Sequence, residues 1–130
     1  IDVTLPPVDQ TMINRYAALS GDDNPVHLDP AFAQAMGLPA PIVHGMMLAG
    51  LSQRGFSCPL REEEPDVFPL HLSCRFLLPV PSGQKIGLSC KQTQIDERRS
   101  ERVTILSETG PHLISQIHFS IQPQSLSVPA

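Results

Sequence analysis

Proline is the feature of this sequence that most limits how the chain can fold. The chain has 14 prolines in 130 residues, about 11% against a typical value near 5%. Proline breaks helices and is kept out of central strands. The prolines therefore predict short helices and strands with defined ends. No repeat or linker is visible, so we expect one domain over residues 1–122, followed by a flexible tail at 123–130.

The charge and the cysteine content indicate which kinds of partner and which cellular compartment this chain suits. The formal net charge is −4, and no cluster of Lys and Arg indicates nucleic acid or an anionic membrane as a partner. No apolar run approaches the roughly 20 residues of a transmembrane helix, and the N-terminus lacks the pattern of a secretory signal. Three cysteines without a CxxC pair favour neither a disulfide framework nor a zinc site. We expect a cytoplasmic protein.

The first third of the chain predicts two short helices around an irregular segment. Asp9 is placed to cap a first helix, which Gly21 ends. Asp29, followed by proline at the first helical position, begins a second helix, and Gly37 ends it. Residues 20–28 between the two helices predict an irregular loop.

Residues 44–51 form a helix that is apolar on nearly every side, which predicts burial. From Leu70 onward the apolar residues alternate, as they do in strands. The alternation predicts four strands at residues 70–78, 86–95, 102–108 and 113–121, with turns at 96–100 and 110–111. We expect an α+β fold in which an antiparallel meander wraps the apolar helix and a second subunit completes its cover.

The segment from Ser20 to His27 brings two carboxylates, an amide and an imidazole into one turn. Gly, Asp, Asn and Pro are ordinary loop residues, and a lone histidine such as His27 is often only a packed core residue. Pro25, however, restricts the residue before it and stiffens the loop. A carboxylate at Asp22 and an imidazole at His27 can share acid–base work on one water molecule.

A second candidate lies at the start of the apolar helix, at His44 and Gly45. The first turn of a helix leaves backbone N–H groups unpaired at the positive end of the helix dipole, and glycine lets a ligand approach them closely. This position could bind an oxyanion. Alternatively, Gly45 serves only close packing, and the His44 ring bonds a neighbouring carbonyl group.

Together, the two segments resemble a known family. The run YAALSGDxNPVHxD at residues 16–29, followed by His-Gly-Met at 44–46, resembles the (R)-specific enoyl-CoA hydratases of the MaoC-like dehydratase family. The run RFLLPV at 75–80 and Gly83 extend the similarity over almost the whole chain. The resemblance implies a hotdog fold, in which an antiparallel sheet wraps a central helix, and a homodimer. It also implies reversible addition of water to a trans-2-enoyl thioester.

The resemblance also implies roles for individual residues. Asp22 and His27 match the catalytic pair, Gly45 matches the residue whose backbone N–H binds the thioester carbonyl, and Asn24 matches a position that supports the loop. Some members have a serine in the central helix where this chain has Gln53, next to Ser52; either could contribute a polar group.

Other charged and titratable residues receive structural interpretations. Arg98, Arg99 and Arg102 could meet coenzyme A phosphates, but a solvated hairpin tip, shared with acidic neighbours that include Glu101, explains them more simply. Cys74 and Cys90 alternate with apolar residues, as core thiols do. The remaining histidines, at 71, 112 and 118, lack metal-ligand spacing.

The leading hypothesis is a hydro-lyase that acts on acyl-CoA or an acyl carrier protein thioester and needs neither metal nor cofactor. Two alternatives stay open: a thioesterase on the same fold, and a non-catalytic acyl-thioester-binding subunit. The sequence leaves the acyl chain, the carrier and the pathway open.

Overall fold

The protein is built on one antiparallel sheet, seen in a computed structural model that describes residues 2–56, 67–95 and 98–121. The sheet has five strands in the order β1-β3-β4-β5-β2, each antiparallel to its neighbours. The strands are β1 (Val3–Leu5), β2 (Val67–Phe76), β3 (Ile86–Ile95), β4 (Arg98–Ser107) and β5 (Gly110–Ile121). The predicted α+β class, with strands gathered in the second half of the chain, is confirmed.

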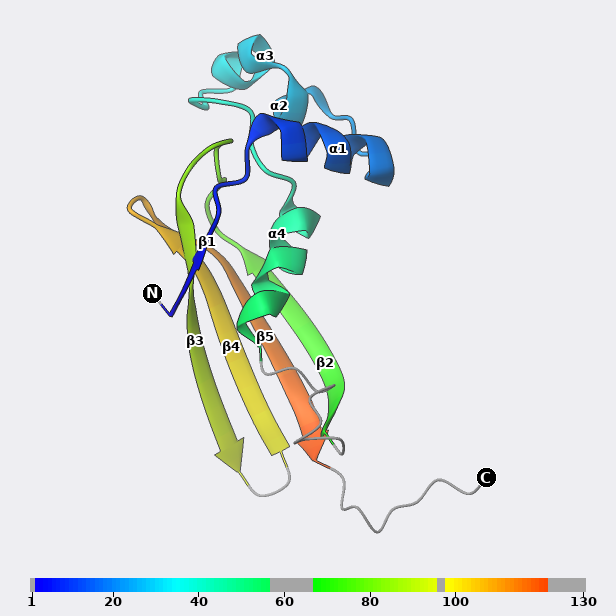
Figure 1. Cartoon of the computed structure of the whole chain (residues 1–130), viewed down its shortest axis with the longest axis vertical. Helices are drawn as coiled ribbons and strands as arrows, with labels where there is room; N and C mark the ends of the chain where they lie inside the picture. Colours follow the sequence, from blue (N-terminus) through cyan, green and yellow to red (C-terminus); the bar gives the residue numbers. More distant parts are fainter. Residues whose placement is uncertain (1, 57–66, 96–97, 122–130) are drawn as a thin grey trace.

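The strand order corrects the predicted meander. Only β3, β4 and β5 follow one another in the sheet, whereas β2 pairs with β5 on the far side. The chain therefore crosses the end of the sheet between β2 and β3 (Figure 1). Alternation of apolar residues shows which face a strand buries but not which strand lies beside it. β1, which pairs with β3, was not predicted because three residues are too few for a pattern.

The β4–β5 hairpin is longer than predicted. β4 already begins at Arg98, and β5 begins at Gly110, so the turn lies at residues 108–109. Arg99 and Glu101 were expected on a solvated tip but are only 6% and 4% exposed. The Arg99 Nη1 and Glu101 Oε2 atoms lie 3.9 Å apart. Both residues share the inward face of β4 with Val103, which explains their burial.

The predicted helix ends at Asp9 and Asp29 are confirmed. The Asp9 carboxylate accepts a hydrogen bond from the Met12 N–H at the start of α1 (Gln10–Ser20), and Gly21 ends this helix with a φ of 79°. Asp29 caps α3 (Pro30–Ala35) in the same way. The segment expected to be irregular contains a further short helix, α2 (Pro25–Leu28), because Asn24 caps it and proline takes its first position.

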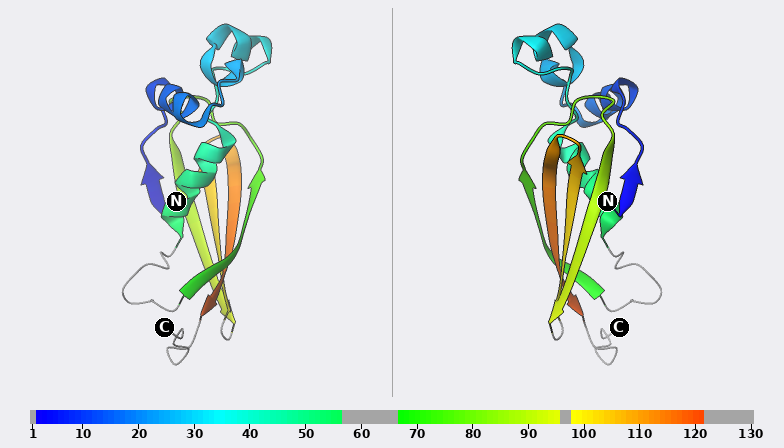
Figure 2. Two further views of the ribbon diagram at one scale, coloured as in Figure 1. Left: turned by 90° about the vertical axis from the view of Figure 1, so that its right-hand side faces the viewer. Right: turned by 90° about the vertical axis from the view of Figure 1, so that its left-hand side faces the viewer.

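The central helix α4 (Gly45–Ser52) lies across one face of the sheet and is followed by a short 3-10 helix, η1 (Gln53–Gly55). α1, α2 and α3 gather beyond the end of the sheet from which α4 starts (Figures 1 and 2). Leu48, Ala49 and Ser52 of α4 are buried, whereas Met46 is 69% exposed. Within one chain the sheet covers a single side of α4, and the expectation that a second subunit completes its cover stays a prediction.

The hydrophobic core lies between α4 and the sheet, and the inward positions of β4 and β5 supply much of it. Cys74 and Cys90 are half-buried free thiols packed against this core, as their alternation predicts. Cys58, the acidic loop at 61–66 and the expected tail at 123–130 lie outside the described residues. None of the helices in the described part of the chain is long and apolar enough to cross a membrane.

Candidate active site

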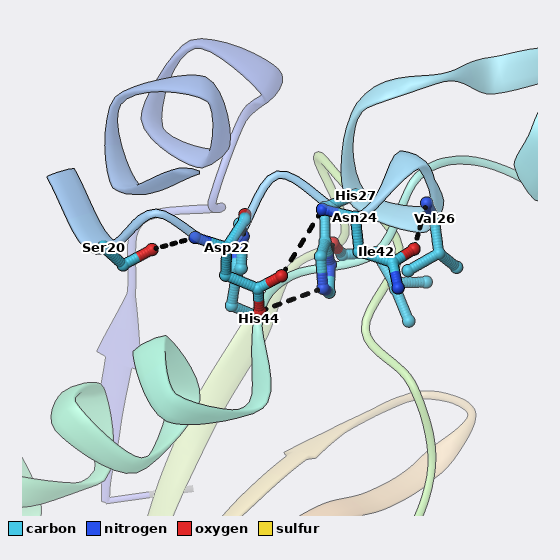
Figure 3. A network of polar contacts seen from close by, with 7 residues as sticks. All are labelled: Ser20, Asp22, Asn24, Val26, His27, Ile42 and His44. Atoms are coloured by element: carbon cyan, nitrogen blue, oxygen red, sulfur yellow. Dashed lines mark hydrogen bonds and ion pairs between the residues drawn. The ribbon is translucent and has the colours of Figure 1, made fainter. Parts of the chain in front are cut away.

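The two segments singled out in the sequence meet at the start of α4. Asp22 lies in the loop between α1 and α2, and His27 lies in α2. The Asp22 Oδ2 and His27 Nε2 atoms are 3.8 Å apart, with the His27 side chain 11% exposed and the Asp22 side chain 54% exposed (Figure 3). One member of the pair is thus held in the protein while the other faces solvent.

Hydrogen bonds between near neighbours in the sequence hold the loop that carries Asp22. The Asn24 Oδ1 atom accepts from the Val26 N–H at 3.0 Å, and the Asn24 N–H donates to Asp22 Oδ1 at 3.4 Å. The Asp22 N–H donates to the Ser20 hydroxyl at 3.2 Å. Asn24 therefore connects the carboxylate to the start of α2, as a loop-supporting residue would.

A backbone contact orients the His27 ring. Its Nδ1 atom lies 2.8 Å from the Ile42 carbonyl oxygen, so Nδ1–H donates to this oxygen. In the neutral ring, the Nε2 atom that faces Asp22 then has a free lone pair. A water molecule between Nε2 and the carboxylate could donate a hydrogen bond to each, and the ring could take up its proton.

His44 ties this loop to the first turn of α4. Its Nε2–H donates to the Asp22 carbonyl oxygen at 2.9 Å, and the residue is 1% exposed. Its ring stacks on His27 with centroids 3.8 Å apart and packs against Tyr16 at 4.7 Å. His44 thus bonds a carbonyl group, one of the predicted alternatives, and places Asp22 and His27 relative to each other.

An apolar cavity of about 250 Å³ opens beside His27. Its lining comprises His27, Ile42, Val43, Gly45, Leu48, Phe76, Leu77, Leu78, Pro79 and His112. Gly45 is the first residue of α4, where backbone N–H groups lack partners within the helix. A Cβ atom at Gly45 would lie 3.1 Å from the Phe76 ring. The glycine therefore keeps this side of the cavity open.

Ser52 and Gln53 lie at the opposite end of α4 from Gly45. The Ser52 hydroxyl is fully buried, donates to the Ala49 carbonyl oxygen at 2.6 Å and contacts the Ser115 hydroxyl at 2.7 Å. Gln53 is exposed, and neither residue lines the cavity. The structure therefore places both away from the Asp22–His27 pair.

Asp22, His27 and His44 each bring a possible metal-ligand atom within 4.8 Å of the others. The two imidazole planes differ by only 20°, however, and the ring centroids are 3.8 Å apart, so the in-plane lone pairs of the stacked rings lie in two separate, nearly parallel planes. A metal ion bound by both rings would require one of them to turn. The arrangement as it stands suits proton transfer better than metal binding.

Sequence reasoning missed His112 as part of the site. It is 1% exposed, lines the cavity and has its Nδ1 atom 3.2 Å from the Leu78 carbonyl oxygen. Its Nε2 atom lies 2.6 Å from the Ser107 hydroxyl. These two contacts hold the His112 ring in the wall of the cavity. No local pattern signals this role, because its partner Leu78 lies 34 positions away in the chain.

Comparison with known proteins identifies the family. The model of the MaoC like domain matches residues 2–110. The chain belongs to this family. It is 43% identical over 84 residues to the (R)-specific enoyl-CoA hydratase of Aeromonas caviae, which covers 63% of this chain. It is 34% identical over 121 residues, 90% of the chain, to the peroxisomal multifunctional enzyme type 2 of Mus musculus.

Solved structures of MaoC-like relatives confirm the predicted hotdog fold. The (R)-hydratase from A. caviae superimposes with a TM-score of 0.73 at 26% identity, covering 94% of this chain and 98% of that one. The curated relatives are longer than the region they share with this chain. The alignments span 60% of the Aeromonas enzyme and 16% of the mouse enzyme.

Proposed function

We propose that this MaoC-like protein catalyses the reversible hydration of a trans-2-enoyl thioester to an (R)-3-hydroxyacyl thioester. The observation that carries the proposal is the Asp22–His27 contact at 3.8 Å beside an apolar cavity that Gly45 lines. The names of the relatives, an (R)-specific enoyl-CoA hydratase and a 3-hydroxyacyl-thioester dehydratase, support this lyase chemistry.

The apolar cavity accounts for acyl binding in this proposal. The chain enters between Leu48 and Phe76, and the thioester carbonyl oxygen accepts a hydrogen bond from the Gly45 N–H. Negative charge builds on this oxygen when water attacks C3, because an enolate forms. A donor aimed at such an oxygen typically lowers the barrier by about 2.7–4 kcal/mol.

Asp22 and His27 bind the water molecule and transfer its protons in this proposal. The carboxylate and the His27 Nε2 lone pair both accept hydrogen bonds from one water molecule. As the water oxygen bonds to C3, one of its protons passes to the pair, and the pair delivers a proton to C2 as the enolate collapses. The product gains one H and one OH, so the step is balanced without a metal or cofactor.

Partners and location follow from the same proposal. The substrate is an acyl-CoA or the thioester of an acyl carrier protein, and the protein acts as a homodimer. Met46 on α4 and Leu72 on β2, which are 69% and 48% exposed, support a second copy, because burying such side chains stabilises association. The cysteine pattern supports a cytoplasmic location.

The test follows the conjugated-thioester absorbance of crotonyl-CoA with the purified protein, Asp22→Asn and His27→Gln, together with chiral analysis of the product. Asp23→Asn is the matched control, because it changes an exposed neighbouring carboxylate. Asp22→Asn and His27→Gln should each lower kcat by about 10²–10⁴-fold, whereas the control should keep it within about twofold. Unchanged turnover in both site variants would reject the proposal, and release of free thiol would indicate a thioesterase.

A further inference from the structure

The sheet face turned away from α4 carries charge of one sign. Its described outward positions on β2 to β5 hold four of the nine Lys and Arg residues of the chain and no Asp or Glu. The four are Arg75, Lys91, Arg98 and Arg102. Because the whole chain has a net charge of −4, this cluster does not simply reflect composition.

A groove of about 420 Å³ lies on this face. It is lined by Ser73, Cys74, Arg75, Arg102, Ile114 and Gln116. Arg75 pairs with Ile114, and Arg102 pairs with Gln116, so the two guanidinium groups approach β5 from its opposite sides. Two guanidinium groups in a groove that also contains the polar side chains of Ser73 and Gln116 suit a phosphate group, which arginine can bind with paired hydrogen bonds.

Neighbouring charges increase the attraction for an anion. Lys91 of β3 lies directly opposite Arg102 of β4, and like charges in such cross-strand positions repel each other. No carboxylate in the described outward positions of these strands offsets the repulsion. A bound anion would therefore relieve it.

The groove and the catalytic cavity share one stretch of chain. Phe76 lines the cavity, and Arg75, the residue before it, lines the groove. Successive residues of a strand point to opposite faces, and β2 is an end strand of the sheet. A polar chain leaving the cavity past Leu77 can therefore round the end of β2 and reach Arg75.

We propose that this groove binds the phosphate groups of the carrier that bears the thioester, a phosphorylated pantetheine such as that of coenzyme A. The inference rests on the proposed function, since the hydratase supplies the thioester. Arg75 and Arg102 are the binding residues, and neither takes part in the water-addition step.

The kinetic test compares crotonyl-CoA with crotonyl-pantetheine, which lacks every phosphate, in Arg75→Gln and Arg102→Gln. Arg54→Gln is the matched control, because it removes an exposed cation from η1, on the helix side of the sheet. Each groove variant should raise the KM for crotonyl-CoA about tenfold, the usual effect of one charge-assisted hydrogen bond. The kcat value, and all values with crotonyl-pantetheine, should stay unchanged. Crotonyl-phosphopantetheine carries only the phosphate that carrier proteins also have. Its KM in the two variants shows whether the groove binds this phosphate or the phosphates of the nucleotide.

Direct binding gives a second readout that needs no turnover. Adenosine 3′,5′-bisphosphate, titrated calorimetrically, should bind the unaltered protein and Arg54→Gln, and each groove variant should bind it about tenfold more weakly. If neither thioester is hydrated, the proposed function fails and this titration alone decides the inference. An unchanged KM for crotonyl-CoA in both variants, or equal bisphosphate binding, would overturn the groove assignment.

Discussion

Replacing Gly55 with alanine tests how tightly η1 packs on the sheet. A Cβ atom at Gly55 would lie 2.8 and 2.9 Å from the two γ-carbons of Val103 and 3.0 Å from the Cys90 sulfur. Val103 is fully buried, and a β-branched side chain has few alternative rotamers. The valine cannot move aside without disturbing the core, so the backbone of η1 must shift.

The magnitude follows from two opposing effects. Overpacking of a well-packed core typically lowers the free energy of unfolding by about 1–3 kcal/mol. Alanine also reduces the conformational freedom of the unfolded chain, which raises the free energy of unfolding by about 0.4–1 kcal/mol. At mid-range values of about 2 and about 0.7 kcal/mol, the net loss in the free energy of unfolding should be about 1.3 kcal/mol. At about 4 °C per kcal/mol for a chain of this length, the Tm should fall by about 5 °C.

Gly50→Ala is the matched control, since it adds the same atom to the exposed side of α4. No heavy atom lies within 4 Å of a Cβ atom there, and alanine is favoured over glycine inside a helix by about 0.5–1 kcal/mol. Thermal and urea unfolding followed by circular dichroism should show Gly55→Ala less stable and Gly50→Ala more stable than the original protein. A Gly55→Ala variant as stable as the original would refute the packing argument.

Three further predictions concern the site, a helix cap and a thiol. Gly45→Ala should lower kcat/KM for crotonyl-CoA at least tenfold, because its Cβ atom would lie 3.1 Å from the Phe76 ring and narrow the cavity; unchanged kinetics would contradict this. Asp9→Ala should cost about 1 kcal/mol in urea unfolding, through loss of the α1 cap. Burial, together with the Asp2 carboxylate, raises the pKa of the Cys90 thiol, so folding favours its protonated form. This contribution to stability is present below the unfolded pKa and is lost as pH rises through the folded pKa, which unfolding measured across the alkaline range should show.

Much of the candidate site could be predicted because its contacts are local in the sequence. Asp22 and His27 are five positions apart, and the Asn24 cap with Pro25 behind it folds the chain between them into one turn. The short distance between Asp22 and His27 in space therefore follows largely from this turn. His44 is different, since its bond to the Asp22 carbonyl oxygen spans 22 positions and depends on where α4 begins.

Local sequence was enough to predict the helix caps at Asp9 and Asp29, the alternation of the later strands and the motif typical of the family. These follow from hydrogen bonds and side-chain alternation among near neighbours. The folded structure was needed to show that β2 lies beside β5, that Arg99 is buried, and that His112 lines the cavity. The physical reason is that strand pairing and cavity shape arise from contacts between distant residues, which local patterns leave open.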